Sequence, residues 1–260
     1  MTSDPTRNRE AVVRKIYRQL GRSWGPQHWW PAETPFEVIV GAILTQNTSW
    51  TNVERALGKL REAHVLSLDG IRALASADLE QLVRSSGYYR QKAERLKRFV
   101  GFLDERYGSS LEAMLAAPTQ QLRAELLSLK GVGRETADAI LLYAGKHEIF
   151  VVDAYTRRIL ERHALVSADA KYDEIRTLME RALCREHPVK FVADNRNPAA
   201  PRRIVVHEPS AMSQSPGSQL SHVYNEMHGL FVQVGKHYCH KLEPNCQNCP
   251  LEKLLPRKSP

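Results

Sequence analysis

The sequence has no uninterrupted apolar run long enough to span a bilayer, and its opening residues, MTSDPTRNRE, lack the apolar stretch of a signal peptide. It is also poor in cysteine: four occur in 260 residues, and three of these lie together near the end. This clustering argues against a disulfide framework and for a metal site, or the remnant of one, in a reducing compartment. We therefore expect a soluble, cytoplasmic protein with no membrane partner.

Acidic residues are in the minority. The chain carries 37 Lys and Arg residues against 29 Asp and Glu residues, which gives a formal net charge of +8. Such a surplus attracts polyanions such as nucleic acids through the release of counterions, although many basic proteins bind none. The length suffices for one large domain or two small ones, each with a proper core.

The most informative stretch is residues 126–158, LLSLKGVGRETADAILLYAGKHEIFVVDAYTRR. It predicts the end of one helix, a tight turn at Gly131-Val132-Gly133 and a second helix over about 136–143. Glycine tolerates positive φ and lets the backbone approach another molecule closely. A turn that opens onto a helix N-terminus presents amide groups and the positive helix end to a phosphate. Taken alone, a Gly-x-Gly pattern is more often a plain turn.

A single carboxylate follows this second helix. Asp153 comes directly after the apolar run 149–152 and before a predicted helix over 155–163. An Asp at this position is usually a helix cap. A carboxylate that emerges from apolar packing is also placed for chemistry.

In combination, these features resemble a known family. The segment 129–137 (LKGVGRETA) resembles the hairpin of the helix-hairpin-helix DNA glycosylases, and Val151-Val152-Asp153 resembles the catalytic aspartate segment of the endonuclease III superfamily. The resemblance covers most of the chain. It implies an all-α fold with two helical lobes and a DNA-binding cleft between them. The six-helix barrel lobe would be 35–146, with the helix-hairpin-helix at about 126–144, and the second lobe would combine 1–34 with 147–260.

One segment departs from that family pattern. Residues 189–219 contain four prolines, scattered serines and no sustained period, and the matching stretch in endonuclease III-like proteins is short. We therefore predict a surface insertion or a disordered segment here. Arg202 and Arg203 within it are candidate DNA contacts, although a neutral loop is the simpler interpretation.

The resemblance assigns a DNA-backbone grip to the hairpin. In the family the backbone amides of this turn hold phosphates, and its carbonyls commonly hold a monovalent cation. Phosphate contacts of this kind give affinity and position but no choice of base. The candidate residues are Leu129, Gly131, Val132, Gly133, Arg134 and Thr136.

The chemistry of base removal then falls to Asp153. Departure of a flipped base leaves an oxocarbenium-like sugar, which a carboxylate stabilises directly or by orienting water. In the bifunctional members, the position that Glu135 occupies here is a lysine, whose amine forms a Schiff base with the sugar. A carboxylate cannot do this, so we expect a monofunctional enzyme that needs no cofactor for catalysis and leaves an intact abasic strand.

The tryptophan-rich loop 23–31, called the early loop below, and the segment 44–50 resemble one branch of the family. That branch is the endonuclease III-type 3-methyladenine DNA glycosylases. In that branch tryptophans stack on a base that carries positive charge, and the faces of indole rings attract cations. The alternatives are that the tryptophans are core and that the lysine among these residues is an exposed helix residue. The candidate pocket residues are Trp29, Trp30, Gln46, Trp50 and Lys236.

The cysteine-rich loop 239–255 matches the iron–sulfur pattern of endonuclease III incompletely. Cys239, Cys246 and Cys249 stand at the first three positions, whereas Leu255 stands at the fourth. A [4Fe–4S] cluster normally takes four thiolates, so we favour a degenerate loop and keep a cluster or a Cys₃His zinc site as alternatives.

The sequence therefore predicts a monomeric DNA glycosylase of base-excision repair whose partner is damaged duplex DNA. It would remove N-alkylated purines and associate with the nucleoid through DNA. The alternatives are a glycosylase for an oxidised pyrimidine or for mismatched uracil or thymine, and a non-catalytic DNA-binding protein that keeps the hairpin as a grip.

Overall fold

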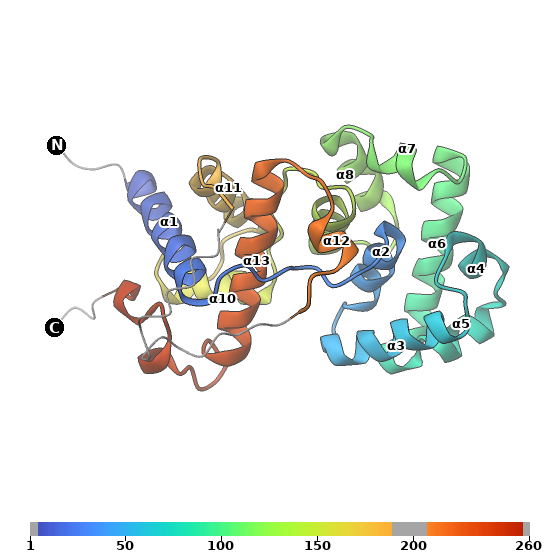
Figure 1. The fold of residues 1–260 in the computed structure, drawn as a ribbon, viewed down its shortest axis with the longest axis horizontal. Helices are drawn as coiled ribbons and strands as arrows, with labels where there is room; N and C mark the ends of the chain where they lie inside the picture. The colour runs from blue at the N-terminus through green and yellow to red at the C-terminus, as the bar shows by residue number, and fades with distance from the viewer. Residues whose placement is uncertain (1–4, 189–206, 257–260) are drawn as a thin grey trace. The chain divides into compact units, whose positions relative to one another are not determined.

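The computed structural model describes residues 5–188 and 207–256, and every regular element in them is a helix, as predicted (Figure 1). The chain divides into two compact units. One unit combines Met1–Pro31 with Glu148–Pro260, and the other is Ala32–His147. These limits lie close to the predicted 35–146. We call Ala32–His147 the hairpin unit and the other the aspartate unit.

The hairpin unit is built around α2 (Pro35–Leu44), which is buried along almost its whole length. Thr34 caps its N-terminus and Pro35 occupies the first turn, as expected for a helix that begins at a proline. Apart from Glu37, its buried residues are apolar, and other helices of the unit pack around it. The remaining elements are α3 (Trp50–Glu62), α4 (Leu68–Ala73), α5 (Ser76–Leu82), η1 (Arg84–Ser86), α6 (Tyr89–Tyr107), α7 (Leu111–Leu115), α8 (Thr119–Ser128), α9 (Arg134–Ala139) and the π-helical turn η2 (Ile140–Ala144).

This unit has more helical segments than the predicted six. The additional short helices include α4 and α7, each of which begins with a serine whose hydroxyl accepts a backbone N–H, Ser67 and Ser110 respectively. Segments of five or six residues are too short to show a helical period, so the sequence pattern does not reveal them.

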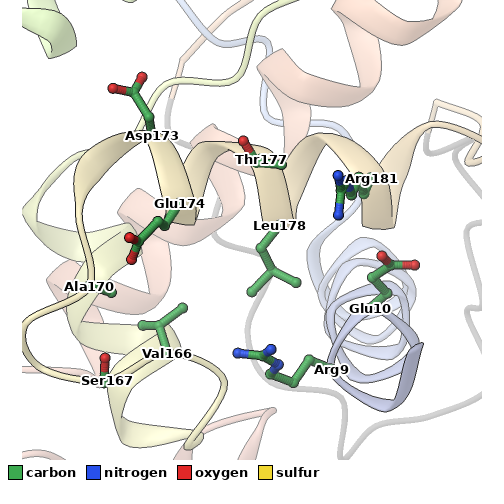
Figure 2. Close-up of a pocket in the computed structure, with 10 residues that line it drawn as sticks. All are labelled: Arg9, Glu10, Val166, Ser167, Ala170, Asp173, Glu174, Thr177, Leu178 and Arg181. Carbon is green, nitrogen blue, oxygen red and sulfur yellow. The ribbon is translucent and has the colours of Figure 1, made fainter. Parts of the chain in front are cut away.

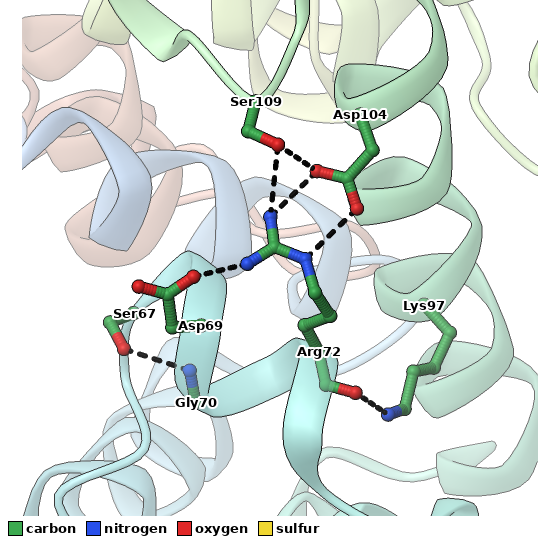
Figure 3. Close-up of polar contacts among 7 residues, drawn as sticks. All are labelled: Ser67, Asp69, Gly70, Arg72, Lys97, Asp104 and Ser109. Atoms are coloured by element: carbon green, nitrogen blue, oxygen red, sulfur yellow. Dashed lines mark hydrogen bonds and ion pairs between the residues drawn. The ribbon is translucent and has the colours of Figure 1, made fainter.

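A polar cluster joins α4 to α6 in the same unit (Figure 3). The guanidinium of Arg72 donates to both carboxylate oxygens of Asp104, at 2.6 and 2.9 Å, and also contacts Asp69. The hydrogen bond from Arg72 lowers the pKa of Asp104 to about 2. The cluster fixes a short helix that has one buried side chain, Ile71.

A buried lysine fastens the end of α2. Lys92 of α6 is fully buried, and its Nζ donates to the carbonyl oxygens of Leu44 at 2.8 Å and Ser86 at 2.5 Å. Burial lowers the pKa of Lys92 to about 8. A positive group at a helix C-terminus also complements the helix dipole, so this contact fixes the point where the chain leaves α2.

The aspartate unit is built around α13 (Gln219–His237), against which α1 (Pro5–Trp24), α10 (Ala154–Arg162) and α11 (Tyr172–Leu183) pack. Gly229 and Gly235 make two close approaches possible. A Cβ at Gly229 would lie 3.0 Å from Cβ of Trp29, and one at Gly235 would lie 2.0 Å from the ring of Tyr155. The unit also contains α12 (Ala211–Gln214), η3 (Cys246–Asn248) and η4 (Glu252–Leu254).

The segment 189–219, predicted to be a surface insertion or a disordered segment, contains a short helix in its described part. Residues 189–206, including Arg202 and Arg203, lie outside the described residues. Residues 207–219 contain α12, which Ser210 caps, and Met212 is buried. The Ser210 hydroxyl also donates to the carbonyl of Trp30 at 3.1 Å, and this contact between distant parts of the chain is invisible to local pattern.

None of the described helices combines the length and the apolar character that crossing a membrane requires. A pocket of about 580 Å³ lies between the start of α1, the loop 166–170 and α11 (Figure 2). Arg9, Glu174 and Arg181 are among its lining residues, and it contains none of the residues that the sequence singles out.

Candidate active site

The predicted glycine turn joins α8 to α9. Gly131 has φ of +92°, a conformation that favours glycine, and the Val132 N–H donates to the carbonyl of Leu129 at 3.0 Å. Gly133 is extended and forms the N-cap of α9, with no side chain to cover the helix end. Arg134 follows it and is exposed. The turn is therefore formed as the sequence predicts.

Three side chains from elsewhere in the hairpin unit brace this turn. Gln46 donates from Nε2 to the Gly131 carbonyl at 3.1 Å and to the Thr136 hydroxyl at 2.9 Å. Its Oε1 in turn accepts from the guanidinium of Arg95. Arg98 donates to the carbonyl of Lys130 at 2.8 Å. The turn is thus held from the side of α2 and from the side of α6.

These contacts give Gln46 a structural role at the glycine turn, in addition to its predicted contact with a base. Both ends of its amide are engaged within the hairpin unit, and Thr136, one of the candidate grip residues, is buried beneath the amide. The contact of Gln46 with a flipped base stays a prediction. Trp50, the first residue of α3, is half-buried in the same unit.

Asp153 is the N-cap of α10. Its Oδ1 accepts the Thr156 N–H at 2.7 Å, and its Oδ2 lies 3.5 Å from Nε2 of His228 on α13. Val151 and Val152, just before it, are buried, so the chain delivers the carboxylate from apolar packing. Burial acts to raise the pKa of Asp153, but the charge and hydrogen bond of His228 and the bonds of Thr156 outweigh it. The net effect lowers the pKa, which keeps the carboxylate ionised.

The tryptophans of the early loop are packed in the aspartate unit. Trp29 is 5% exposed and Trp30 is 6% exposed, and their rings meet edge to face at 5.8 Å. The Trp29 ring also lies 5.5 Å from that of His207 and 6.0 Å from that of His228. This matches the alternative interpretation in which these tryptophans are core, and their stacking on a base stays a prediction.

Sequence reasoning missed the two histidines beside Trp29. His207 lies within the segment 189–219, and burial together with the charge of Lys236 lowers the pKa of His207 to about 4. His228 sits in the middle of α13, just before the buried apolar run 230–232. A polar, titratable residue amid apolar neighbours was the available signal, but a satisfied core histidine gives the same signal. Lys236 itself is exposed in the last turn of α13.

An exposed aromatic side chain stands out at the turn into α6. Tyr88 is 65% exposed and has φ of +47°, directly after Gly87 at +68°. The buried Lys92 holds the carbonyl of Ser86 just before this turn and so fixes it.

The cysteine loop follows α13 and is held to α10. Arg158 donates to the Cys239 carbonyl at 2.7 Å, and Arg162 donates to Sγ of Cys239 at 3.1 Å. Cys239, Cys246 and Cys249 line one small cavity, and Leu255 lines it with them. Its volume of about 20 Å³ is the space of roughly one water molecule.

This donor set does not fit a four-thiolate cluster. The residue at the fourth family position is Leu255, which carries no ligand atom, and it faces the same cavity as the three thiols. Within residues 5–188 and 207–256, no group of three His, Cys, Asp or Glu side chains has an arrangement that could hold a metal ion. The degenerate loop stays a prediction for this region.

Comparison with known proteins bears on both units. Residues 40–184 match the model of the HhH-GPD superfamily base excision DNA repair proteins. A predicted DNA repair glycosylase of Methanocaldococcus jannaschii is 40% identical over 248 residues, which cover 95% of this chain and 97% of that protein.

Solved structures give the same result for the fold. The chain is similar to the H. pylori 3-methyladenine DNA glycosylase MagIII bound to 1,N6-ethenoadenine, with a TM-score of 0.67 and 27% identity over 90% of this chain and 99% of that one. A non-covalent endonuclease III–DNA complex is similar in fold, with a TM-score of 0.70 and 20% identity over 95% of this chain and 94% of that one.

Proposed function

Because the chain belongs to the HhH-GPD superfamily of base excision DNA repair proteins, we propose that it is a monofunctional DNA N-glycosylase for N-alkylated purines. Membership of this superfamily supports the assignment of the chain as a DNA glycosylase of base-excision repair. The finer assignment depends on two further points, the nucleophile and the leaving group.

The observation that carries the proposal is Glu135 at the start of α9. Directly after Gly133-Arg134, where the bifunctional glycosylases that this hairpin resembles carry a lysine, the chain has an exposed carboxylate. A carboxylate cannot form a Schiff base with the sugar. Water is then the nucleophile, and the products are a free base and an uncut abasic strand.

Lys130 and Lys236 are the two other candidates for that amine. Lys130 is exposed before the glycine turn, so the turn separates it from the start of α9. Lys236 follows His228 on α13, and a rise of about 1.5 Å per residue puts it about 12 Å further along that helix. Its amine would have to reach back over two turns to meet Asp153, so neither lysine is a natural nucleophile.

Asp153 supplies the charge that the reaction requires. As the glycosidic bond breaks, positive charge develops on the sugar, and a fixed anion stabilises that charge. The lowered pKa of Asp153 keeps it ionised at neutral pH. Its hydrogen bond to the Thr156 N–H orients the carboxylate before any substrate arrives.

The leaving group determines the substrate class. A neutral base needs a proton from the enzyme to depart, whereas an N-alkylated purine already carries positive charge. His207 has a pKa of about 4, so it is uncharged at neutral pH and a poor acid there. His228 is paired with Asp153. An ionised carboxylate without a dedicated acid suits a base that is already cationic, and the likeness to MagIII, a 3-methyladenine DNA glycosylase, supports this class.

The test is chromatography of the bases released from methylated duplex DNA by the wild type and by Asp153→Asn. We expect the wild type to release alkylated purines, and the variant to lose turnover by roughly a hundredfold or more while it still binds DNA. Equal release by both proteins would refute the role of Asp153, and binding without any release would leave only a DNA-binding protein.

Borohydride trapping tests the nucleophile separately. We expect no covalent adduct between the wild type and DNA, because no amine attacks the sugar. A trapped adduct would show a bifunctional enzyme, and Lys130→Met and Lys236→Met would then identify the amine. Release of an oxidised pyrimidine with strand cleavage would replace the proposed substrate class.

A further inference from the structure

The carboxylate of Asp153 has two oxygens, and a different element holds each one. Oδ1 accepts the Thr156 N–H at 2.7 Å from within α10. Oδ2 faces Nε2 of His228, at 3.5 Å, from α13. The N-cap hydrogen bond alone still permits the carboxylate to rotate about its Cβ–Cγ bond. A second contact from another helix removes that freedom.

The imidazole of His228 is itself held in place. Its side chain is 6% exposed, and the ring lies 6.0 Å from that of Trp29 and 6.5 Å from that of Phe150, which it meets edge to face. Phe150 belongs to the apolar run that directly precedes Asp153. The same segment therefore helps to position both the carboxylate of Asp153 and the imidazole of His228. The next residue, Gly229, lets the Trp29 loop press against α13, because a Cβ there would lie 3.0 Å from Cβ of Trp29.

We infer that His228 is a positioning residue for Asp153: its Nε2–H holds Oδ2 so that the carboxylate faces the developing charge on the sugar. This rests on the proposed function, since it gives the carboxylate a reaction to serve. A distance of 3.5 Å is at the long end for such a contact, and catalytic hydrogen bonds are often long before substrate binds. In this role Trp29 acts through His228, because its ring supports the imidazole.

Two substitutions at His228 test the hydrogen-bond donor and the aromatic ring separately. His228→Phe keeps a planar ring between Trp29 and Phe150 but removes the donor. His228→Gln keeps an N–H donor of similar reach but loses the ring. We expect His228→Phe to slow single-turnover base release roughly tenfold to a hundredfold, as expected for the loss of a hydrogen bond to a charged group. We expect His228→Gln to restore most of that loss. His222→Phe, on the same helix, is the control for a histidine lost elsewhere.

A double substitution distinguishes positioning from general loss of structure. In the Asp153→Asn background, His228→Phe should cause no further loss of rate, because the carboxylate that it orients is gone. Thermal unfolding and DNA binding of each variant show whether the fold and the hairpin grip persist.

The outcomes for the two claims differ. If the wild type releases bases and Asp153→Asn does not, the proposed function stands whatever His228 does. A folded His228→Phe with a rate within twofold of the wild type would overturn the inference alone. So would an equal loss from His228→Phe in both backgrounds. If His228→Phe does not fold, a His228→Gln rate as low as that of Asp153→Asn would overturn it.

Discussion

The side-chain amide of Gln46 donates to the hydroxyl of Thr136 at 2.9 Å, although 90 positions separate the two residues in the chain. The same amide nitrogen reaches the carbonyl of Gly131, at 3.1 Å. The loop after α2 therefore holds both the glycine turn and the first turn of α9. A phosphate grip works by pre-arranged backbone groups, so a residue that fixes the turn contributes to affinity without touching DNA.

Gln46→Ala tests this bracing role. We expect weaker binding to damaged and undamaged duplexes alike, with lesion preference unchanged, and a loss of about 1–3 kcal/mol in stability from the two hydrogen bonds that Gln46 donates and the one that it accepts from Arg95. Fluorescence anisotropy with both duplexes and urea unfolding measure these effects. Gln120→Ala, an exposed glutamine on α8, is the control. Loss of base release with undiminished binding to undamaged DNA would instead mean that Gln46 reads the base.

The two glycines of the turn should respond differently to alanine. Gly131 has φ of +92°, and an added Cβ would lie 2.3 Å from Nε of Arg95, whereas at Gly133 nothing lies within 4 Å. We expect Gly131→Ala to lower the free energy of unfolding by about 1–3 kcal/mol, from backbone strain and displacement of Arg95. Gly133→Ala should leave it nearly unchanged.

The same pair also reports on the approach of DNA. Gly133→Ala folds normally by the argument above, so any loss of DNA affinity in this variant measures how closely a phosphate comes to that backbone. Unchanged affinity in Gly133→Ala would contradict a phosphate contact at Gly133. Equal unfolding energies for the two variants would contradict the tight contact of Gly131 with Arg95.

Acid should weaken the link between α4 and α6. The pKa of Asp104 is about 2 in the folded protein against an ordinary value of 3.8. A lowered carboxyl pKa stabilises the fold above the unfolded value, and this contribution is lost as the pH falls from about 3.8 to about 2. The difference in thermal midpoint between wild type and Asp104→Asn should therefore be present at neutral pH and shrink over that window.

Asp69 provides the control for that titration. It contacts the same guanidinium, Arg72, but its side chain is 94% exposed. We expect Asp69→Asn to change the midpoint little at any pH, because exposed ion pairs contribute little. An Asp104→Asn difference that persists unchanged at pH 2 would show that the carboxylate charge is not its source.

The cysteine loop should fold without an iron–sulfur cluster. Arg158 and Arg162 already hold Cys239, and Leu255 stands where the fourth thiolate would be. We expect the purified wild type to contain less than one iron per chain. Leu255→Cys restores the family's four-thiolate spacing and should take up iron on anaerobic reconstitution. A wild type purified with a full cluster would contradict this, and stoichiometric zinc would indicate a site completed by a histidine.

Local pattern was sufficient for much of this protein. The helices predicted over about 136–143 and over 155–163 formed as α9 with η2 and as α10, and the glycine turn and the Asp153 cap formed where their sequences indicated. These features depend on residues a few positions apart, so sequence spacing determines them. Short helices such as α4 and α12, each set by a serine cap, were missed because one turn shows no period.

Tertiary structure alone decided the partners of the candidate site residues. The sequence identified Asp153 but not His228, and Gln46 but not its bonds to the hairpin. It named Trp29 without fixing whether the ring would be buried, and the fold buries it beside two histidines. Such contacts join distant parts of the chain, and only the packing of helices against one another brings those parts within a few ångströms.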